Sequence, residues 1–172
     1  KANELSNLPK FYLDLKSYKK SLLNNSNPFT PAVNLMFALD EALKMMKEEG
    51  LENIFQKHER HKRAISEAVK KLNLKLFANE NSLSPSITAI EAQNFDAESF
   101  RKSIQNKYGI QLAGGQDHLK GKIFRVGHLG YINDRDIISV ISAIGLTLYE
   151  RNMVNENDIG QALIEAKKHL EG

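Results

Sequence analysis

The sequence of 172 residues contains no cysteine. Disulfide frameworks, thiolate metal sites and cysteine nucleophiles are therefore excluded. Proline occurs only 4 times, and no apolar run approaches the ~20 residues that a helix needs to cross a bilayer. A Pro-rich disordered chain and a membrane partner are both disfavoured, so we expect a globular protein of the cytoplasm.

A strong charge of one sign is also lacking. The 24 basic and 21 acidic side chains leave a net charge of +3, which is too weak and too mixed for a nucleic-acid groove. We therefore expect no nucleic-acid partner. The chain does have the length and the 41% hydrophobic residues that one buried core requires. Its first residue is Lys1 rather than Met, so we expect a piece of a longer protein.

Helical patterns occupy the first half of the chain after Thr30. A threonine followed by Pro31 predicts a helix start, because the hydroxyl can cap free amides and proline at the first helical position loses no hydrogen bond. Apolar residues then recur at three- and four-residue steps as far as Gly50, and a second series of this kind continues to Leu72. The spacing predicts two consecutive amphipathic helices.

Strand and helix patterns alternate in the second half. Short stretches that suit a sheet are bounded by turn residues, and Asp96 and Asn133 stand where helices would begin. This order indicates an α+β fold, with a small antiparallel-rich sheet and helices packed on one side. The expected elements are strands 74–77 and 86–91, helix 97–108, strands 110–112 and 122–126, and helices 134–148 and 159–170.

Three segments follow one another in a recognisable order. They read Phe-Tyr-Leu-Asp at 11–14, Asn-Pro-Phe-Thr-Pro-Ala at 27–32, and Ala-Gly-Gly-Gln at 113–116 followed by Gly-Lys-Ile-Phe-Arg-Val-Gly-His-Leu-Gly at 121–130. Together they resemble the C-terminal part of class V (fold type I) pyridoxal-phosphate-dependent aminotransferases, of the alanine:glyoxylate and serine:pyruvate type.

The resemblance implies a domain organisation and an activity. Residues 1–30 would lead from a large domain, residues 31–150 would form the C-terminal small domain, and residues 151–172 would be a helical extension. The parent enzyme would be a homodimer that transfers an amino group between alanine or serine and glyoxylate or pyruvate. Its cofactor would be pyridoxal 5'-phosphate.

The resemblance also implies that the cofactor is bound covalently by a lysine shortly before the Phe-Tyr-Leu-Asp segment. Lys1 and Lys10 precede Phe11, but neither stands in the Ser-x-x-Lys-like context of that family lysine. We assign no catalytic residue in this chain. The chain alone is therefore expected to be inactive.

Arg125 is the candidate for substrate binding. Strand alternation places it on the face opposite Phe124 and Val126, and a guanidinium can hold a carboxylate by two parallel hydrogen bonds. The resemblance implies that the matching arginine binds the substrate α-carboxylate. Without the resemblance, an ordinary solvated or salt-bridged arginine would be the better interpretation.

Thr30 and Asn27 are the candidates for cofactor binding. A hydroxyl and free amides at a helix N-terminus suit a phosphate, although capping alone would also explain Thr30. The resemblance implies that the matching threonine contacts the cofactor phosphate of the neighbouring subunit. Some relatives carry a tyrosine where this chain has Asn27, whose amide could still donate a hydrogen bond.

Other residues fit ordinary structural roles at least as well as a site. Gly114 and Gly115 could admit a ligand or form a turn with positive φ. His58 and His61 lie close on a helix, but no third ligand is visible, so solvated or half-buried histidines are expected and no metal site. His128 could line the same cleft as the Arg125 strand or be a structural histidine.

Two alternative functions stay open at this point. The same order of strands and helices occurs in stand-alone ferredoxin-like modules that sense ligands or bind partners. An RNA-binding version is disfavoured, because Phe124 is the single aromatic residue of the predicted inner strands. A truncated paralogue that acts in dimerisation or regulation would keep the family and change the role.

Overall fold

The computed structural model describes residues 2–171, and their contacts divide the chain into two compact units. Unit 1 is Lys1–Glu49 and unit 2 is Gly50–Gly172. The sequence placed boundaries after residues 30 and 150, whereas the contacts separate the chain between the two long helices that meet at Gly50. Gly50 has φ +84°, a conformation that suits glycine.

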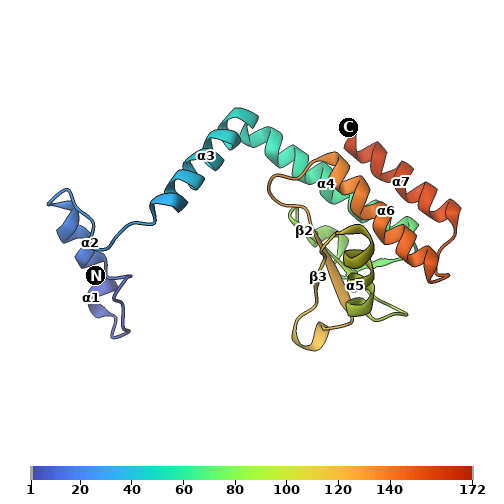
Figure 1. Cartoon of the computed structure of the whole chain (residues 1–172), viewed down its shortest axis with the longest axis horizontal. Helices are drawn as coiled ribbons and strands as arrows, with labels where there is room; N and C mark the ends of the chain where they lie inside the picture. The colour runs from blue at the N-terminus through green and yellow to red at the C-terminus, as the bar shows by residue number, and fades with distance from the viewer. Residues whose placement is uncertain (1, 172) are drawn as a thin grey trace. The chain divides into compact units, whose positions relative to one another are not determined.

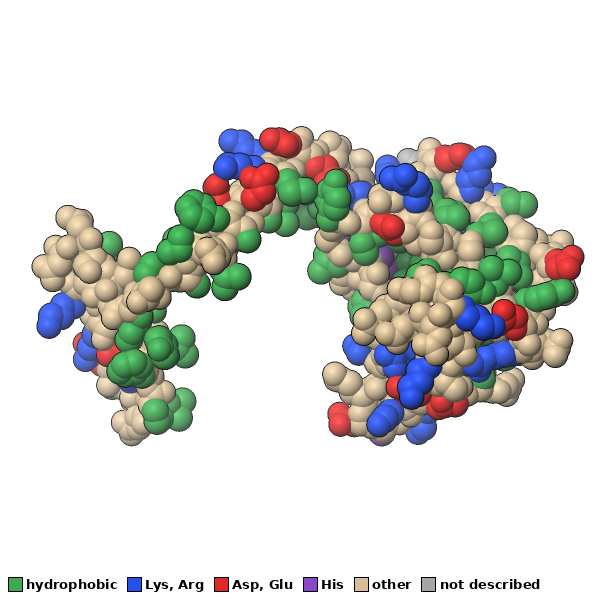
Figure 2. All heavy atoms as spheres, viewed as in Figure 1, with side chains coloured by type: hydrophobic (Ala, Val, Ile, Leu, Met, Phe, Trp, Pro, Cys, Tyr) green, Lys and Arg blue, Asp and Glu red, His purple; other side chains and the backbone are tan. Residues whose placement is uncertain are grey.

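Unit 1 consists of helices with no buried side chain. Its elements are α1 (Ala2–Leu5), α2 (Leu15–Leu22) and α3 (Val33–Glu49), and none of them contains a buried residue. Figure 2 shows apolar side chains at the surface along α3, where Phe37 is 70% exposed. The predicted start of α3 at Pro31 was wrong by two residues, and Thr30 forms no capping bond, because the helix begins only at Val33.

Unit 2 has the predicted α+β architecture. Figure 1 shows α4 (Leu51–Lys71), α6 (Asp134–Glu150) and α7 (Glu156–Leu170) lying along one another, and α4 also contacts β1 and β2 of the sheet. Two short 3-10 helices, Glu80–Ser82 and Asp117–Leu119, lie in the connections. The main elements are α4 (Leu51–Lys71), β1 (Lys75–Leu76), β2 (Ile87–Glu91), α5 (Ala97–Tyr108), β3 (Ala113–Gly114), β4 (Ile123–Gly127), α6 (Asp134–Glu150) and α7 (Glu156–Leu170).

Helix ends follow the predicted capping residues. The side chain of Asp96 accepts a hydrogen bond from the backbone of Ser99 at the start of α5, and Gly109 ends that helix with φ 69°. Asn133 forms a capping box with Asp136 at the start of α6. These contacts satisfy amides that a helix leaves without partners in its first turn. The predicted starts of α5 and α6 are therefore confirmed.

The four strands form one antiparallel sheet in the order β1-β2-β4-β3. The sequence predicted strand β3 at residues 110–112, and this position was wrong. The ladder instead pairs Ala113 with Arg125 and Gly114 with Phe124. The apolar residues just before β3 supply the buried Leu112 to the core without entering the ladder.

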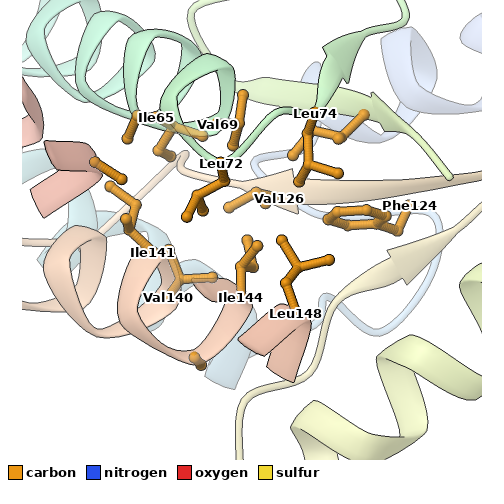
Figure 3. Packing of buried hydrophobic residues seen from close by; sticks show 14 of the residues in the cluster. Ile65, Val69, Leu72, Leu74, Phe124, Val126, Val140, Ile141, Ile144 and Leu148 are labelled. Atoms are coloured by element: carbon orange, nitrogen blue, oxygen red, sulfur yellow. The ribbon is translucent and has the colours of Figure 1, made fainter. Parts of the chain in front are cut away.

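One face of the sheet carries the core. Phe124 and Val126 of β4 and Ile90 of β2 point into a cluster that also contains residues of α4 and α6, as Figure 3 shows for ten of its members. The α4 and α6 residues labelled there are Ile65, Val69, Val140, Ile141, Ile144 and Leu148. Helices therefore cover this one face, as the sequence predicted.

Helix α7 belongs to the same core. Its Ala162, Ala166 and Leu170 are buried within the cluster, although the sequence set residues 151–172 apart as an extension. Small residues on one side of α7 allow close packing against α4 and α6. None of the helices within residues 2–171 is long and apolar enough to span a membrane.

Candidate functional site

Arg125 lies on the sheet face that the core does not use. Its neighbours Phe124 and Val126 are buried on the core face, while Arg125 itself is half-buried. Its Nε donates a hydrogen bond of 2.9 Å to the carbonyl oxygen of Gly114. Because Nε is held by the adjacent strand, the guanidinium has a fixed direction and keeps both Nη groups for another acceptor.

Small residues flank Arg125 on both neighbouring strands. The register places Ala89 of β2 on one side and Ala113 of β3 on the other. Within residues 2–171, no carboxylate pairs with the Arg125 guanidinium. An unpaired guanidinium between two small side chains is a group to which a carboxylate can bind.

Arg101 provides a contrast close to the same strand. Its Nε donates a hydrogen bond of 2.7 Å to the carbonyl oxygen of Leu112, but its Nη1 is paired with Glu98 at 2.8 Å. Both arginines thus fix the backbone near β3 through Nε. Arg101 has an internal counter-ion and Arg125 has none among the described residues, so Arg125 is the one suited to a ligand.

Close packing against backbone requires Gly115, whereas Gly114 lies against the ends of two flexible side chains, Glu98 and Arg101. A Cβ atom on Gly115 would lie 2.1 Å from the carbonyl oxygen of Leu119, and one on Gly114 would lie 2.5 Å from Glu98 Oε1. Neither glycine has positive φ, so a turn that needs positive φ, one of the two interpretations open in the sequence, does not explain them. At Gly115 the close approach is made by the backbone of the protein itself, which explains this residue without a ligand.

Asn27 and Thr30 lie in unit 1, where they line one shallow hollow. The other residues around it are Tyr12, Ser26, Pro28, Phe29 and Pro31. The side chains of Asn27 and Thr30 are exposed and form no hydrogen bond with any described residue. Their donors are therefore available to an acceptor such as a phosphate oxygen.

Aromatic rings form the wall of this hollow. Phe29 packs against Tyr12 with ring centroids 4.6 Å apart and against Phe11 at 5.0 Å. Tyr18 approaches the same ring at 6.2 Å. Packing of this kind stabilises the segment that carries Asn27 and Thr30. The predicted cofactor residues are thus brought together in unit 1, while Arg125 belongs to unit 2.

A cluster of buried histidines in unit 2 was not predicted. His58 is 8% exposed and His61 and His128 are fully buried, so the expectation that His58 and His61 are solvated or half-buried was wrong. The sequence did hold a signal, because His58 continues the apolar series of α4. Its partner lies 70 residues away, where the Nδ1 of His58 is 2.9 Å from the carbonyl oxygen of His128.

Burial favours the neutral form of two of these imidazoles, those of His128 and His61. Desolvation, with smaller contributions from the nearby His61 and His58, lowers the pKa of His128 to about 4. Desolvation also lowers the pKa of His61, although the carboxylate of Asp134 opposes this shift. Among residues 2–171, no group of three or more His, Asp or Glu side chains could hold a metal ion.

Known proteins of several organisms are similar in sequence to this chain. No family model matches. A protein of Synechococcus sp. named soluble hydrogenase, small subunit, is 51% identical over 154 residues, which are 90% of this chain and 40% of that protein. An uncharacterized aminotransferase of Methanocaldococcus jannaschii is 39% identical over 142 residues, or 81% of this chain and 37% of that protein. The chain thus spans about two fifths of the length of these curated relatives.

Solved structures of aminotransferases share the fold of this chain. The crystal structure of ureidoglycine-glyoxylate aminotransferase from Bacillus subtilis matches 97% of this chain and 44% of its own length, with a TM-score of 0.86 and 27% sequence identity. The homologues and structural neighbours include class V aminotransferases of the alanine- and serine-glyoxylate type, and this chain matches only their C-terminal part. The resemblance seen in the sequence is confirmed.

Proposed function

We propose that this chain is the C-terminal part of a pyridoxal-phosphate-dependent aminotransferase in which Arg125 binds the carboxylate of the substrate. The reaction would transfer an amino group between a small amino acid such as alanine or serine and a 2-oxo acid such as glyoxylate or pyruvate. The aminotransferase relatives and the similarity to a solved aminotransferase support this choice.

The state of Arg125 is the observation that carries the proposal. Its guanidinium is oriented by the bond from Nε to Gly114, lies between Ala89 and Ala113, and has no carboxylate partner among the described residues. A fixed, unpaired guanidinium loses little entropy when it binds a carboxylate. Binding through the carboxylate would orient the α-carbon of the substrate for reaction.

Thr30 and Asn27 would hold the phosphate of the cofactor. The hydroxyl and the amide are exposed at the hollow of unit 1 and lack hydrogen-bond partners among residues 2–171, so their donors fit an anionic group. When bound, pyridoxal phosphate supplies the electron sink that amino transfer requires. In a homodimer these two residues would serve the site of the neighbouring subunit.

The rest of the parent protein would complete the site. The lysine that anchors the cofactor would lie in the part of the relatives that this chain does not match. The exposed apolar side chains of α3 would pack against that part, since apolar patches of this extent mark contact surfaces. The chain alone would fold in unit 2 but would not transfer amino groups.

The proposal is tested by substituting Arg125 in the full-length protein. Arg125→Ala should raise the KM for the oxo acid about 100-fold, because loss of a charge-assisted carboxylate contact costs ~2–5 kcal/mol. Arg125→Lys should recover part of this loss. Arg63→Ala is the matched control, since Arg63 is 62% exposed and pairs with Glu59. A KM that Arg125→Ala leaves unchanged would contradict the proposal.

Two further measurements separate the alternatives. Because one relative is named as a hydrogenase subunit, hydrogen-dependent dye reduction should be assayed on the same preparation, and we expect aminotransfer without it.

The chain alone should be mixed with pyridoxal phosphate and treated with borohydride. We expect no stoichiometric labelling of a single lysine, and such labelling would refute the predicted inactivity of the chain.

A further inference from the structure

Two histidines of α4 hold both ends of the loop between β4 and α6. At the start of the loop, the Nδ1 of His58 is 2.9 Å from the carbonyl oxygen of His128. At its end, the Nε2 of His61 is 2.9 Å from Oδ1 of Asp134. His58 and His61 are three residues apart in a helix, so they lie on the same face and can act on the same loop.

The acceptors decide which nitrogen of each ring carries the hydrogen. Carbonyl and carboxylate oxygens accept hydrogen bonds and do not donate them. His58 must therefore donate from Nδ1 and His61 from Nε2, which are opposite tautomers when both rings are neutral. Both rings are buried, and the bond to the His128 carbonyl is buried as well, so this acceptor is costly to leave unpaired. The carboxylate of Asp134 is 50% exposed, so the loss of its bond should cost less.

His128 connects this arrangement to the sheet. Its backbone N–H donates to the carbonyl oxygen of Ser86 at 2.9 Å, and its Nε2 is 3.0 Å from Oγ1 of Thr88. Thr88 in turn pairs with Val126 in the ladder. The residue whose carbonyl His58 holds is thus also fixed to β2, three residues after Arg125.

Between the two held ends, Ile132 is half-buried against the core, while the neighbouring loop side chains are exposed. Leu129 is 66% exposed and Tyr131 is 87% exposed, and Gly130 adopts φ +94°. A short loop with exposed apolar side chains gains little from packing of its own. Apart from the contact of Ile132 with the core, its position therefore depends on the hydrogen bonds at its ends.

We propose that His58 and His61 are positioning residues that fix residues 128–134, and through His128 the end of β4, so that Arg125 presents its guanidinium in one orientation. This inference rests on the proposed function, in which Arg125 binds the substrate carboxylate. The histidines touch no substrate and act through the backbone. Loss of either contact should loosen the loop and the strand end together.

Asparagine and glutamine distinguish the two contacts. The amide nitrogen of asparagine lies near the position of imidazole Nδ1, and that of glutamine reaches the position of Nε2. His58→Asn and His61→Gln should therefore keep their contacts, while His58→Gln and His61→Asn should lose them. Each amide serves as the control for the other, because helix propensity and polarity change similarly at both positions.

Amide hydrogen exchange of the chain gives the first readout. His58→Gln should speed exchange at residues 128–133 about tenfold or more, since an unpaired buried acceptor favours local opening. His61→Asn should speed it less, because the carboxylate of Asp134 is half-exposed and can bond to water. The two conservative variants should exchange as the unchanged chain does. Equal exchange in all four variants would overturn the proposal that the two histidines fix this loop, whatever the protein catalyses.

Kinetics of the full-length protein give the second readout. His58→Gln and His61→Asn should raise the KM for the carboxylate substrate about tenfold and change kcat less, while His58→Asn and His61→Gln recover the original KM. A merely structural role would lower thermal stability without this pattern, and that result would overturn the positioning role. If the full-length protein shows no aminotransfer, the proposed function fails, and carboxylate binding to the same four variants decides the inference.

Discussion

The two units of this chain differ in what they do with their apolar side chains. Unit 2 buries them, with Phe100, Ile144 and Leu148 among the residues that have no exposed surface. Unit 1 buries no side chain within residues 2–49, although α3 is as long as α6, at 17 residues each. Apolar spacing alone therefore predicts that a helix forms, while its burial depends on what lies beside it.

The largest expected effect contrasts one phenylalanine from each unit. Phe100 packs against Phe124 with ring centroids 5.1 Å apart and is fully buried, so Phe100→Ala should lower the free energy of unfolding of the chain by ~3–5 kcal/mol. Phe37 is 70% exposed, and Phe37→Ala should change it by less than ~0.5 kcal/mol. Urea denaturation followed by circular dichroism measures both. Similar losses would show that unit 1 has a core of its own.

The next largest effect is expected from acid, which should lower the stability of unit 2 but not of unit 1, because all 5 histidines follow Gly50. The pKa of His128 is lowered from 6.5 to about 4 in the folded state, so the unfolded state binds more protons between these values. The contribution to stability is fully present above pH ~6.5, and it falls by ~3 kcal/mol as the pH drops toward the folded pKa.

Urea denaturation at pH values between about 7 and 4 measures this loss. Probes in unit 2 should follow it, while probes in unit 1 should not. His128→Gln removes one titrating group and keeps a side chain that can bond to Thr88, so it should reduce the dependence, of which His61 contributes the rest. A variant that remains as sensitive to acid as the unchanged chain would show that other groups cause it.

Contacts that depend on distant residues were harder to foresee than local ones. Helix α5 was predicted because Asp96 and Gly109 mark its ends locally. Strand β3 was misplaced because its two residues are defined by pairing with β4. The burial of His61 was missed because its partner Asp134 stands 73 residues later, and no spacing within α4 reveals it.

For the candidate site, too, local patterns predicted some features, while others depend on the fold. Strand alternation was enough to place Arg125 opposite the core face, and the burial pattern of β4 confirms it. The family resemblance was needed to choose Arg125 over other arginines. That its guanidinium lacks a carboxylate partner among residues 2–171 depends on where Glu98 and other acids lie in the fold. The roles of Thr30 and Asn27 stay predictions.

Smaller changes in stability are expected when a single methyl group is added to a glycine of unit 2. Gly115→Ala would bring a Cβ within 2.1 Å of the Leu119 carbonyl oxygen, and the required backbone shift should cost ~1–3 kcal/mol. Gly160→Ala meets nothing within 4 Å in α7 and should add up to ~1 kcal/mol of stability. Thermal denaturation of both variants measures the opposite signs. A stable Gly115→Ala variant would show that this turn is not close-packed.

The smallest effect should come from the helix caps, with one taken from each unit. Asn155 accepts a hydrogen bond from the backbone of Asp158 in a capping box that begins α7, and Asn155→Ala should lower the stability of unit 2 by ~1 kcal/mol. Asp14 caps α2 through the backbone of Lys16. Since α2 buries nothing, Asp14→Ala should reduce helix content locally and leave the urea midpoint unchanged. An equal shift of the midpoint by both variants would mean that the two units unfold together, and the contrast between them would then lie in burial but not in stability.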